Sequence, residues 1–274
     1  MTRKRKKKLS SRKSGRKPKV SSAYTLARLH DEMIVNFERK RYEQALSAAR
    51  KLIQVAPRRS DERFDAFSIA GVCLMELRRF DEAYEVLSKA VKAFPDDSAL
   101  RSNLAGAALF TSRMGMALQE LRVAAELEPK GTRLRKIIDR QMRDIEPLVM
   151  AEIQDRGPDF TLEQLIEQQE LYQKGLKLMN KQRWREAEQT FREVISMADV
   201  LPQPWNSLGN ALLMQRRVDE AREAFQRALE LDPDYELAKK NLEVIEHVDE
   251  DFQPMLLVNK PFIDAKIDIV SDTD

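Results

Sequence analysis

The sequence has little of what most non-helical folds require. Its 274 residues include only eight glycines, and aromatic residues make up 7%, whereas 34% of the residues are charged and 42% are hydrophobic. Few glycines combined with abundant charge favour helices with solvated outer faces and argue against an all-β or dinucleotide-binding fold. The hydrophobic share is large enough to form a buried core.

Cysteine and long apolar segments are also scarce. Cys73 is the single cysteine, so no intrachain disulfide forms, and no apolar run approaches the roughly 20 residues that span a bilayer. The basic start of the chain is not followed by the apolar stretch of a secretory signal peptide. We therefore expect a soluble protein of a reducing compartment, in the cytoplasm, or in the nucleus if the source is eukaryotic.

Residues suited to catalysis are few. The two histidines, His30 and His247, are far apart and lie on polar helical segments, where we expect exposed surface positions. The sequence has no glycine-rich phosphate loop, no paired-cysteine metal spacing and no nucleophile elbow. Cys73 stands where other repeats described below have alanine, so it is interpreted as a packing residue. We predict no enzyme activity, no catalytic residue, no metal and no cofactor.

The charges that are present are unevenly distributed. Residues 1–20 hold eleven Lys and Arg and no acid, which leaves 37 basic against 45 acidic residues in the rest of the chain. A basic arm on an acidic body suggests that the two parts bind different partners. The cations of the arm are Arg3, Lys4, Arg5, Lys6, Lys7, Lys8, Arg12, Lys13, Arg16, Lys17 and Lys19.

The arm has no aromatic residue that could stack on a base. Its binding to nucleic acid, a ribosome, anionic lipid or an import receptor would therefore be electrostatic and would weaken steeply with salt. The alternative is that the arm only keeps the chain soluble.

An internal repeat of 34 residues accounts for most of the remaining sequence. Small residues and an aromatic or leucine return at this spacing in four copies, three of which close with proline, and a weaker copy ends at Pro57. The recurring residues are Gly71, Ala83, Pro95, Ala105, Ala117, Pro129, Gly175, Ala187, Phe191, Trp205, Gly209, Ala221, Phe225 and Pro233.

These residues resemble the consensus of the tetratricopeptide repeat (TPR) family. The resemblance implies an all-α fold, a TPR α-solenoid that stacks antiparallel helix pairs, A and B, into a right-handed superhelix of about five repeats. Glycine or alanine at the eighth and twentieth positions lets helices A and B of one repeat approach closely. Proline closes each repeat because it cannot continue the helix. Asp81 and Asp219 are predicted N-caps of their B helices.

Residues 132–167 depart from the repeat. They indicate one long helix from Arg133 to about Gln154, a break before Asp159, and a new helix capped by Thr161. We favour a degenerate repeat over a spacer between two arrays. The predicted organisation is a disordered basic arm (1–22), three TPR repeats (23–131), the irregular segment (132–167), two further repeats (168–235), a capping helix (236–248) and a disordered acidic tail (249–274).

The resemblance also implies a concave groove lined by the A helices. The residues expected there combine apolar side chains with amides, which suits an amphipathic helix or an extended peptide. Alternatively, neighbouring repeats cover several of them, and Asn103 and Asn241 equally suit bonds between helices. The predicted groove residues are Ser68, Val72, Asn103, Tyr172, Leu176, Asn206, Asn210 and Asn241.

Heat-shock co-chaperones of the TPR family grip a C-terminal carboxylate with a lysine at the fifth repeat position. This chain has no lysine there, so the resemblance does not extend to that function. The residues at that position are His30, Ser68, Ser102, Tyr172 and Asn206.

The favoured function is a protein-interaction adaptor or assembly factor that holds a peptide or helix in the groove while the arm tethers it to a polyanion. The alternative is a nucleic-acid or ribosome-associated protein whose affinity comes mainly from the arm. A third hypothesis is autoregulation, because the tail from Asp249 to Asp274 has seven acids, two lysines and short apolar clusters that could occupy the groove or cover the arm.

Overall fold

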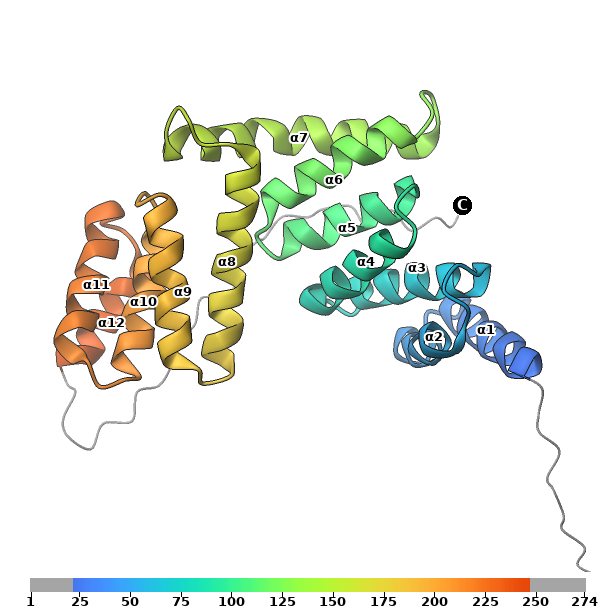
Figure 1. The fold of residues 1–274 in the computed structure, drawn as a ribbon, viewed down its shortest axis with the longest axis horizontal. Coiled ribbons are helices and arrows are strands. Elements are labelled where there is room, and N and C mark those ends of the chain that lie inside the picture. The colour runs from blue at the N-terminus through green and yellow to red at the C-terminus, as the bar shows by residue number, and fades with distance from the viewer. Residues whose placement is uncertain (1–21, 247–274) are drawn as a thin grey trace, which may run out of the picture.

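The computed structural model describes residues 22–246, which fold into twelve α-helices joined by short connections, with no strand in that range (Figure 1). The fold is the all-α TPR solenoid that the sequence predicts. The helices are α1 (Ser22–Glu38), α2 (Tyr42–Val55), α3 (Asp61–Glu76), α4 (Phe80–Ala93), α5 (Ser98–Phe110), α6 (Met114–Leu127), α7 (Arg133–Arg156), α8 (Leu162–Asn180), α9 (Trp184–Met197), α10 (Pro202–Leu213), α11 (Val218–Leu231) and α12 (Glu236–Glu246).

Residues 1–21 and 247–274 lie outside this description. The predictions for the basic arm, His247 and the acidic tail therefore fall on residues that the structure does not describe. None of the helices between residues 22 and 246 combines the length and apolarity needed to cross a membrane.

Helices pair along the chain as antiparallel neighbours, α1 with α2, α3 with α4, α5 with α6, α8 with α9 and α10 with α11. Close packing within a pair depends on glycine. A Cβ atom built on Gly209 would lie 2.5 Å from Cε1 of Phe225, and one built on Gly71 would lie 2.5 Å from Cδ2 of Leu87. A methyl group does not fit at either distance, which is the reason expected for small residues at these repeat positions.

The turn between the two helices of a pair has a constant conformation. A residue with positive φ precedes an arginine that occupies the N-cap position of the B helix. The prediction that Asp81 and Asp219 are N-caps is wrong, because α4 and α11 begin two residues earlier than it requires, after the N-caps Arg79 and Arg217. Their carboxylates lie in the first helical turn, where their negative charge still interacts favourably with the positive end of the helix dipole.

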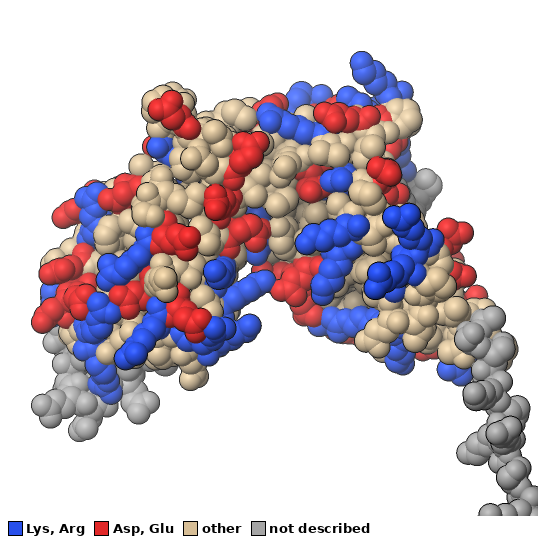
Figure 2. All heavy atoms as spheres, in the orientation of Figure 1, with Lys and Arg blue, Asp and Glu red and all other residues tan. Residues whose placement is uncertain are grey.

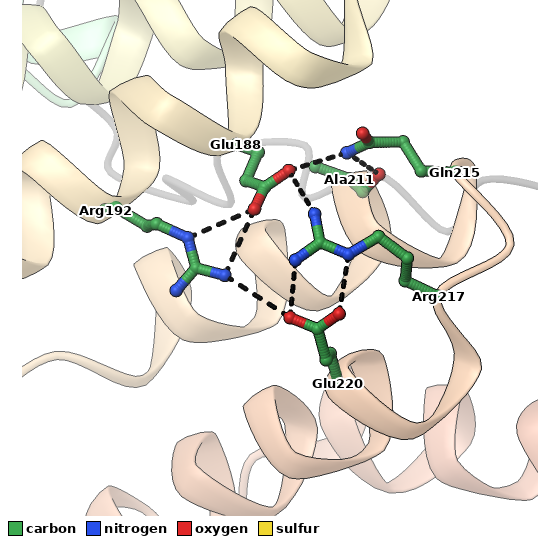
Figure 3. A network of polar contacts seen from close by, with 6 residues as sticks. All are labelled: Glu188, Arg192, Ala211, Gln215, Arg217 and Glu220. Carbon is green, nitrogen blue, oxygen red and sulfur yellow. Dashed lines mark hydrogen bonds and ion pairs between the residues drawn. The ribbon is translucent and has the colours of Figure 1, made fainter.

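The arginine at this N-cap position usually bonds the glutamate three residues later. Arg79 pairs with Glu82, and Arg217 donates to Glu220 at 2.6 Å. Arg217 also reaches back to Glu188 on α9 at 2.7 Å. Figure 3 shows this network, in which Glu188 additionally accepts from Arg192 and Gln215 and thereby links α9 to the turn before α11.

Helix α7 does not follow the alternation of A and B helices. It packs chiefly on α6, whereas α3, α5 and α10 each also contact the preceding A helix. The predicted helix from Arg133 is confirmed and reaches Arg156, and the predicted cap Thr161 is confirmed as a capping box with Gln164. This packing favours a spacer over a degenerate repeat, and the choice between the two stays a prediction.

The helices form two stacks, the N-terminal array (residues 22–127) and the C-terminal array (residues 162–246). Helix α7 lies across one end of both, and α8 runs crosswise from it (Figure 1). Helix α8 packs on α9 within its own array and on α6 of the other. The space-filling view shows a hollow between the two arrays on the side away from α7 (Figure 2).

Candidate functional site

A cavity of about 510 Å³ opens where α8, α10 and α12 meet the C-terminal end of α7. Helices α8 and α10 are the A helices of the C-terminal array, and α12 continues their order, so the cavity belongs to the face that the TPR resemblance assigns to ligands. Its wall combines aliphatic side chains, four glutamines and two tyrosines. Such a mixture of apolar surface with a few placed polar groups is typical of ligand sites.

One face of α8 supplies the largest part of the wall. Gln168, Tyr172 and Leu176 follow each other at intervals of four residues, so they lie on the same side of the helix. The hydroxyl of Tyr172 lies 3.2 Å from Oγ of Ser207 on α10, and its ring packs tilted against Phe191, with 5.8 Å between the ring centroids. These contacts fix the tyrosine at the side of the cavity.

The glutamines of the wall differ in whether their side-chain amides already form hydrogen bonds within the protein. Gln168 is buried, accepts from Nε of Arg156 at 2.6 Å and donates to the carbonyl of Val194 at 3.2 Å, so it is part of the frame. Gln203, on the first turn of α10, also lines the cavity. Its Oε1 is enclosed, and no hydrogen bond to it is found among residues 22–246. An enclosed acceptor without a donor is costly, so a ligand N–H there would be favourable.

The end of the cavity near α7 is charged. Glu152, Asp155 and Arg156 are the charged residues of the wall, and all three lie in the last two turns of α7. The side chain of Arg156 is 3% exposed, and its Nη2 lies 3.6 Å from Oε2 of Glu152. Burial raises the pKa of Glu152, although Arg156 and a hydrogen bond from Gln169 oppose that shift.

The position of α8, and so of the cavity, depends on Arg113 in the turn before α6. This arginine occupies the same repeat position as Arg79, but Met116 replaces the glutamate three residues later. Its guanidinium therefore has no carboxylate partner within its own turn, where Nη1 donates only to the carbonyl of Thr111 at 3.3 Å. It is instead 1% exposed, and Nε donates to Glu170 of α8 at 2.9 Å.

Two further residues complete this junction between the arrays. Tyr84 of α4 donates to the same oxygen of Glu170 at 2.6 Å, and its ring lies 4.2 Å from the guanidinium carbon of Arg113. Burial, followed by the bond to Glu170, raises the pKa of Tyr84. The backbone N–H of Gly115 donates to Gln169 at 3.1 Å, and a Cβ on this glycine would lie 3.0 Å from Ile166. Arg113, Gly115 and Met116 thus adapt this turn to receive α8.

The predicted groove residues separate into three groups. Tyr172 and Leu176 line the cavity, whereas Ser68, Val72 and Asn103 lie half-buried on α3 and α5 of the other array. The three remaining asparagines are buried. Nδ2 of Asn241 donates to Oδ1 of Asn206 at 2.8 Å, and Asn210 is 7% exposed. Whether any of these residues contacts a partner stays a prediction.

Contacts between successive A helices explain why the asparagines are buried. Tyr172 meets Ser207, and Asn206 meets Asn241, each 35 residues apart. A repeat of 34 residues brings each residue of one A helix beside the position one later in the next repeat. This spacing of 35 residues is present in the sequence and could have identified these contacts between A helices. The predicted groove also lacked the glutamines of the cavity, such as Gln168, which lies one helical turn before Tyr172.

His30 follows the same rule and corrects a prediction. It was expected on exposed surface, but it is half-buried, and Nε2 lies 2.8 Å from Oδ2 of Asp65, which is 35 residues later on α3. Cys73 is buried, and burial raises the pKa of its thiol to about 12, so it packs as expected and is poorly reactive. Across the described residues, no three His, Cys, Asp or Glu side chains gather as a metal site would require.

Two family models described as tetratricopeptide repeat match the chain, one over residues 74–131 and 172–236 and the other over residues 36–102. Together they cover more than half of the chain. No curated protein matches it.

Solved structures with similar folds include three chains of low identity. MamA protein is 18% identical, with a TM-score of 0.36, and the match covers 77% of this chain and 93% of that one. The TPR2AB domain of yeast Sti1 in complex with pHSP90 is 15% identical, with 82% and 84% covered and a TM-score of 0.38. YrrB, described as a TPR protein with an unusual peptide-binding site, is 16% identical, with 81% and 98% covered and a TM-score of 0.35. At these values, family membership rests on the family models.

Proposed function

Because this chain belongs to the tetratricopeptide repeat family, we propose that it is a non-enzymatic adaptor or assembly factor that binds a polypeptide segment in the cavity of its C-terminal array. The cavity is the observation that carries the proposal. It lies among the A helices, and it joins an aliphatic wall to glutamines that can bond a peptide backbone.

The volume fits a short segment of chain. A cavity of about 510 Å³ is within the range of sites that enclose most of a small ligand, so it would hold a few residues while the rest of the partner runs along the array. Gln203 supports an extended peptide, because its enclosed Oε1 needs a donor and a backbone N–H supplies one. Neither argument requires a covalent step.

Replacing Leu176 by Glu tests the proposal. A carboxylate in the apolar part of the cavity should remove the partners that affinity purification with mass spectrometry recovers from the wild-type chain. Leu127→Glu is the matched control, because Leu127 is 39% exposed on α6 and does not line the cavity. Both variants should keep the helical circular dichroism spectrum. Identical partner lists for the wild type and Leu176→Glu would exclude the cavity as the binding site.

A second candidate function is polyanion binding by the basic arm, and α7 supports it. Four cations on α7 are exposed and recur every three or four residues, on the side of the helix opposite the buried Ile138 and Ile145. They are Arg133, Lys136, Arg140 and Arg143. Figure 2 shows Lys and Arg gathered at the N-terminal end of this helix. This helix face would add to the positive charge that the arm offers a polyanion.

Salt dependence separates this function from peptide capture. Fluorescence anisotropy with a mixed-sequence RNA should show affinity that falls steeply between low and high salt and is largely lost when residues 1–20 are deleted. Lys136→Glu combined with Arg140→Glu should weaken binding further. RNA binding that is unchanged by the deletion, or absent at low salt, would contradict this second function.

A further inference from the structure

The cavity of the C-terminal array carries an unbalanced charge at one end. Glu152 and Asp155 supply two carboxylates, and Arg156 supplies the only guanidinium of the wall. Arg156 is not available to a ligand, because Nη1 donates to the carbonyl of Glu152 at 2.6 Å and Nε donates to Gln168 at 2.6 Å. The carboxylate of Asp155 is exposed, and no ion pair to it is found in the described part of the chain. One negative charge is therefore left over.

The end of α7 adds to this negative potential. The helix is 24 residues long and ends at Arg156, followed by Gly157 with φ 124°. Carbonyl groups of the last turn of a helix carry the negative end of its dipole, equivalent to about half an elementary charge. Because Glu152 and Asp155 lie in the last two turns, their charge and that of the dipole have the same sign. A cation of the ligand is favoured at this place.

Another part of the cavity wall is apolar. Leu176, Leu201 and Leu237 come from α8, the residue before α10, and α12, and Pro204 lies beside them. This surface is suited to an aliphatic side chain, which gains free energy in proportion to the apolar area that it buries. Gln203 also lines the cavity, and no donor to its enclosed Oε1 is found among residues 22–246.

From these three features we infer that the cavity selects a peptide segment that carries a Lys or Arg a few residues from an aliphatic side chain. The cation lies at Glu152 and Asp155, the aliphatic side chain lies against Leu176 and Leu237, and a backbone N–H of the peptide donates to Gln203. This inference rests on the proposed peptide binding and adds the chemistry of the partner. It concerns the folded cavity and is independent of the basic arm.

A library of random dodecapeptides displayed on phage and selected against the full chain tests the inference. The expected consensus has a Lys or Arg at a fixed distance from Leu, Ile, Val or Met. Selected peptides are then synthesised with a fluorescein label, and their dissociation constants are measured by anisotropy. A consensus without a cation overturns the inference.

Charge reversal at Asp155 identifies where the cation binds. Asp155→Lys should raise the dissociation constants of the labelled peptides by about five- to tenfold, because an attraction between the peptide cation and the rim of the cavity becomes a repulsion. Asp159→Lys is the matched control, since Asp159 is exposed nearby and does not line the cavity, and it should change affinity by less than about twofold. A peptide with Gln in place of the cation should be insensitive to Asp155→Lys. If Asp155→Lys and Asp159→Lys lowered the peptide affinity equally, the assignment of the cation to Asp155 would be overturned.

The failure of this inference is distinguishable from failure of the proposed function. If Leu176→Glu abolishes binding of the selected peptides and Asp155→Lys does not alter it, the cavity binds peptides without a preference for a cation. If Leu176→Glu leaves binding of every selected peptide intact, the cavity is not the peptide site, and both proposals fail.

Discussion

At the scale of single residues, the distance between paired helices decides which glycines are essential. Gly209 faces the ring of Phe225, and a Cβ there would be far too close, at 2.5 Å. Gly106 lies in the middle of α5 with only Cε of Met75 near it, at 3.9 Å from a built Cβ. Both are helical glycines, so the contrast between them comes from packing alone.

Alanine substitution at these two sites should therefore have opposite effects. Gly209→Ala forces α10 and α11 apart and should lower the free energy of unfolding by about 1–3 kcal/mol. Gly106→Ala meets only an ordinary contact and removes the helix penalty of glycine, so it should raise stability by about 0.5–1 kcal/mol. Urea denaturation followed by circular dichroism measures both. A gain in stability for Gly209→Ala would contradict the close approach.

Residue patterns predicted the packing positions better than the polar ones. Glycine, alanine and proline recur because each repeat meets the same steric constraint, so their roles follow from spacing alone. Asp81 was misplaced because a preference for capping residues does not determine whether the helix begins two residues earlier, after Arg79. The burial of Asn206 was not predicted, because its partner, Asn241, lies in the next repeat and the contact depends on how repeats stack.

At the scale of elements, a single replacement in the third repeat changes what its turn does. In three other repeats the N-cap arginine pairs with a glutamate three residues later, as Arg183 does with Glu186. In the third repeat Met116 stands at that position, and Arg113 turns to Tyr84 and Glu170 instead. An arginine at the same repeat position is therefore exposed at Arg183 and buried in the junction between the arrays at Arg113.

Arg113→Met should therefore release α8 from the N-terminal array. The loss of a charged hydrogen bond in a buried position should lower stability by about 1.5–3 kcal/mol. Spin labels on cysteines introduced at Lys92 and Lys240, with Cys73 replaced by Ala, should show a broader distance distribution between the arrays.

Arg183→Met is the control at the equivalent position. Because Arg183 is about half exposed, this change should leave both the stability and the distance distribution close to those of the wild type. A narrow distribution in Arg113→Met would show that apolar contacts alone hold the junction.

The network around Glu188 predicts an acid-sensitive link between α9 and the turn before α11. Burial alone would raise the pKa of Glu188, but hydrogen bonds from Gln215, Arg217 and Arg192 outweigh it and lower the pKa below its ordinary value of 4.5. A lowered folded-state pKa contributes stability that is present above pH 4.5 and is lost as the pH falls through the folded value.

Glu188→Gln should destabilise the chain by about 1–2 kcal/mol at pH 7, and the difference from the wild type should shrink as the pH falls below 4.5. Urea titrations at pH 7 and pH 3 measure the effect. Glu193→Gln, at an exposed site on the same helix, should show no such dependence. A difference that is equal at both pH values would exclude the charge of Glu188 as its cause.

At the scale of the whole molecule, the relation between the two arrays could not be derived from the repeat. The spacing of 34 residues gives the contacts within each array, because every copy stacks on the last in the same way. Residues 132–167 carry no such period, so the direction of α7 and the docking of α8 on α6 depend on particular contacts such as Gly115 with Gln169. The cavity at the end of α7 depends on that docking, so only Tyr172 and Leu176 of its wall were predicted.

The central claim is that a peptide binds in the cavity of the C-terminal array. Photocrosslinking tests it most directly, with p-benzoylphenylalanine placed at Gln173 in the cavity or at Val72 on α3 of the N-terminal array, and with a dodecapeptide from the phage selection as the probe. Efficient crosslinking from position 173 and little from position 72, with excess unlabelled peptide suppressing the former, is the predicted result. Crosslinking from position 72 alone would place the peptide in the other array and contradict the claim.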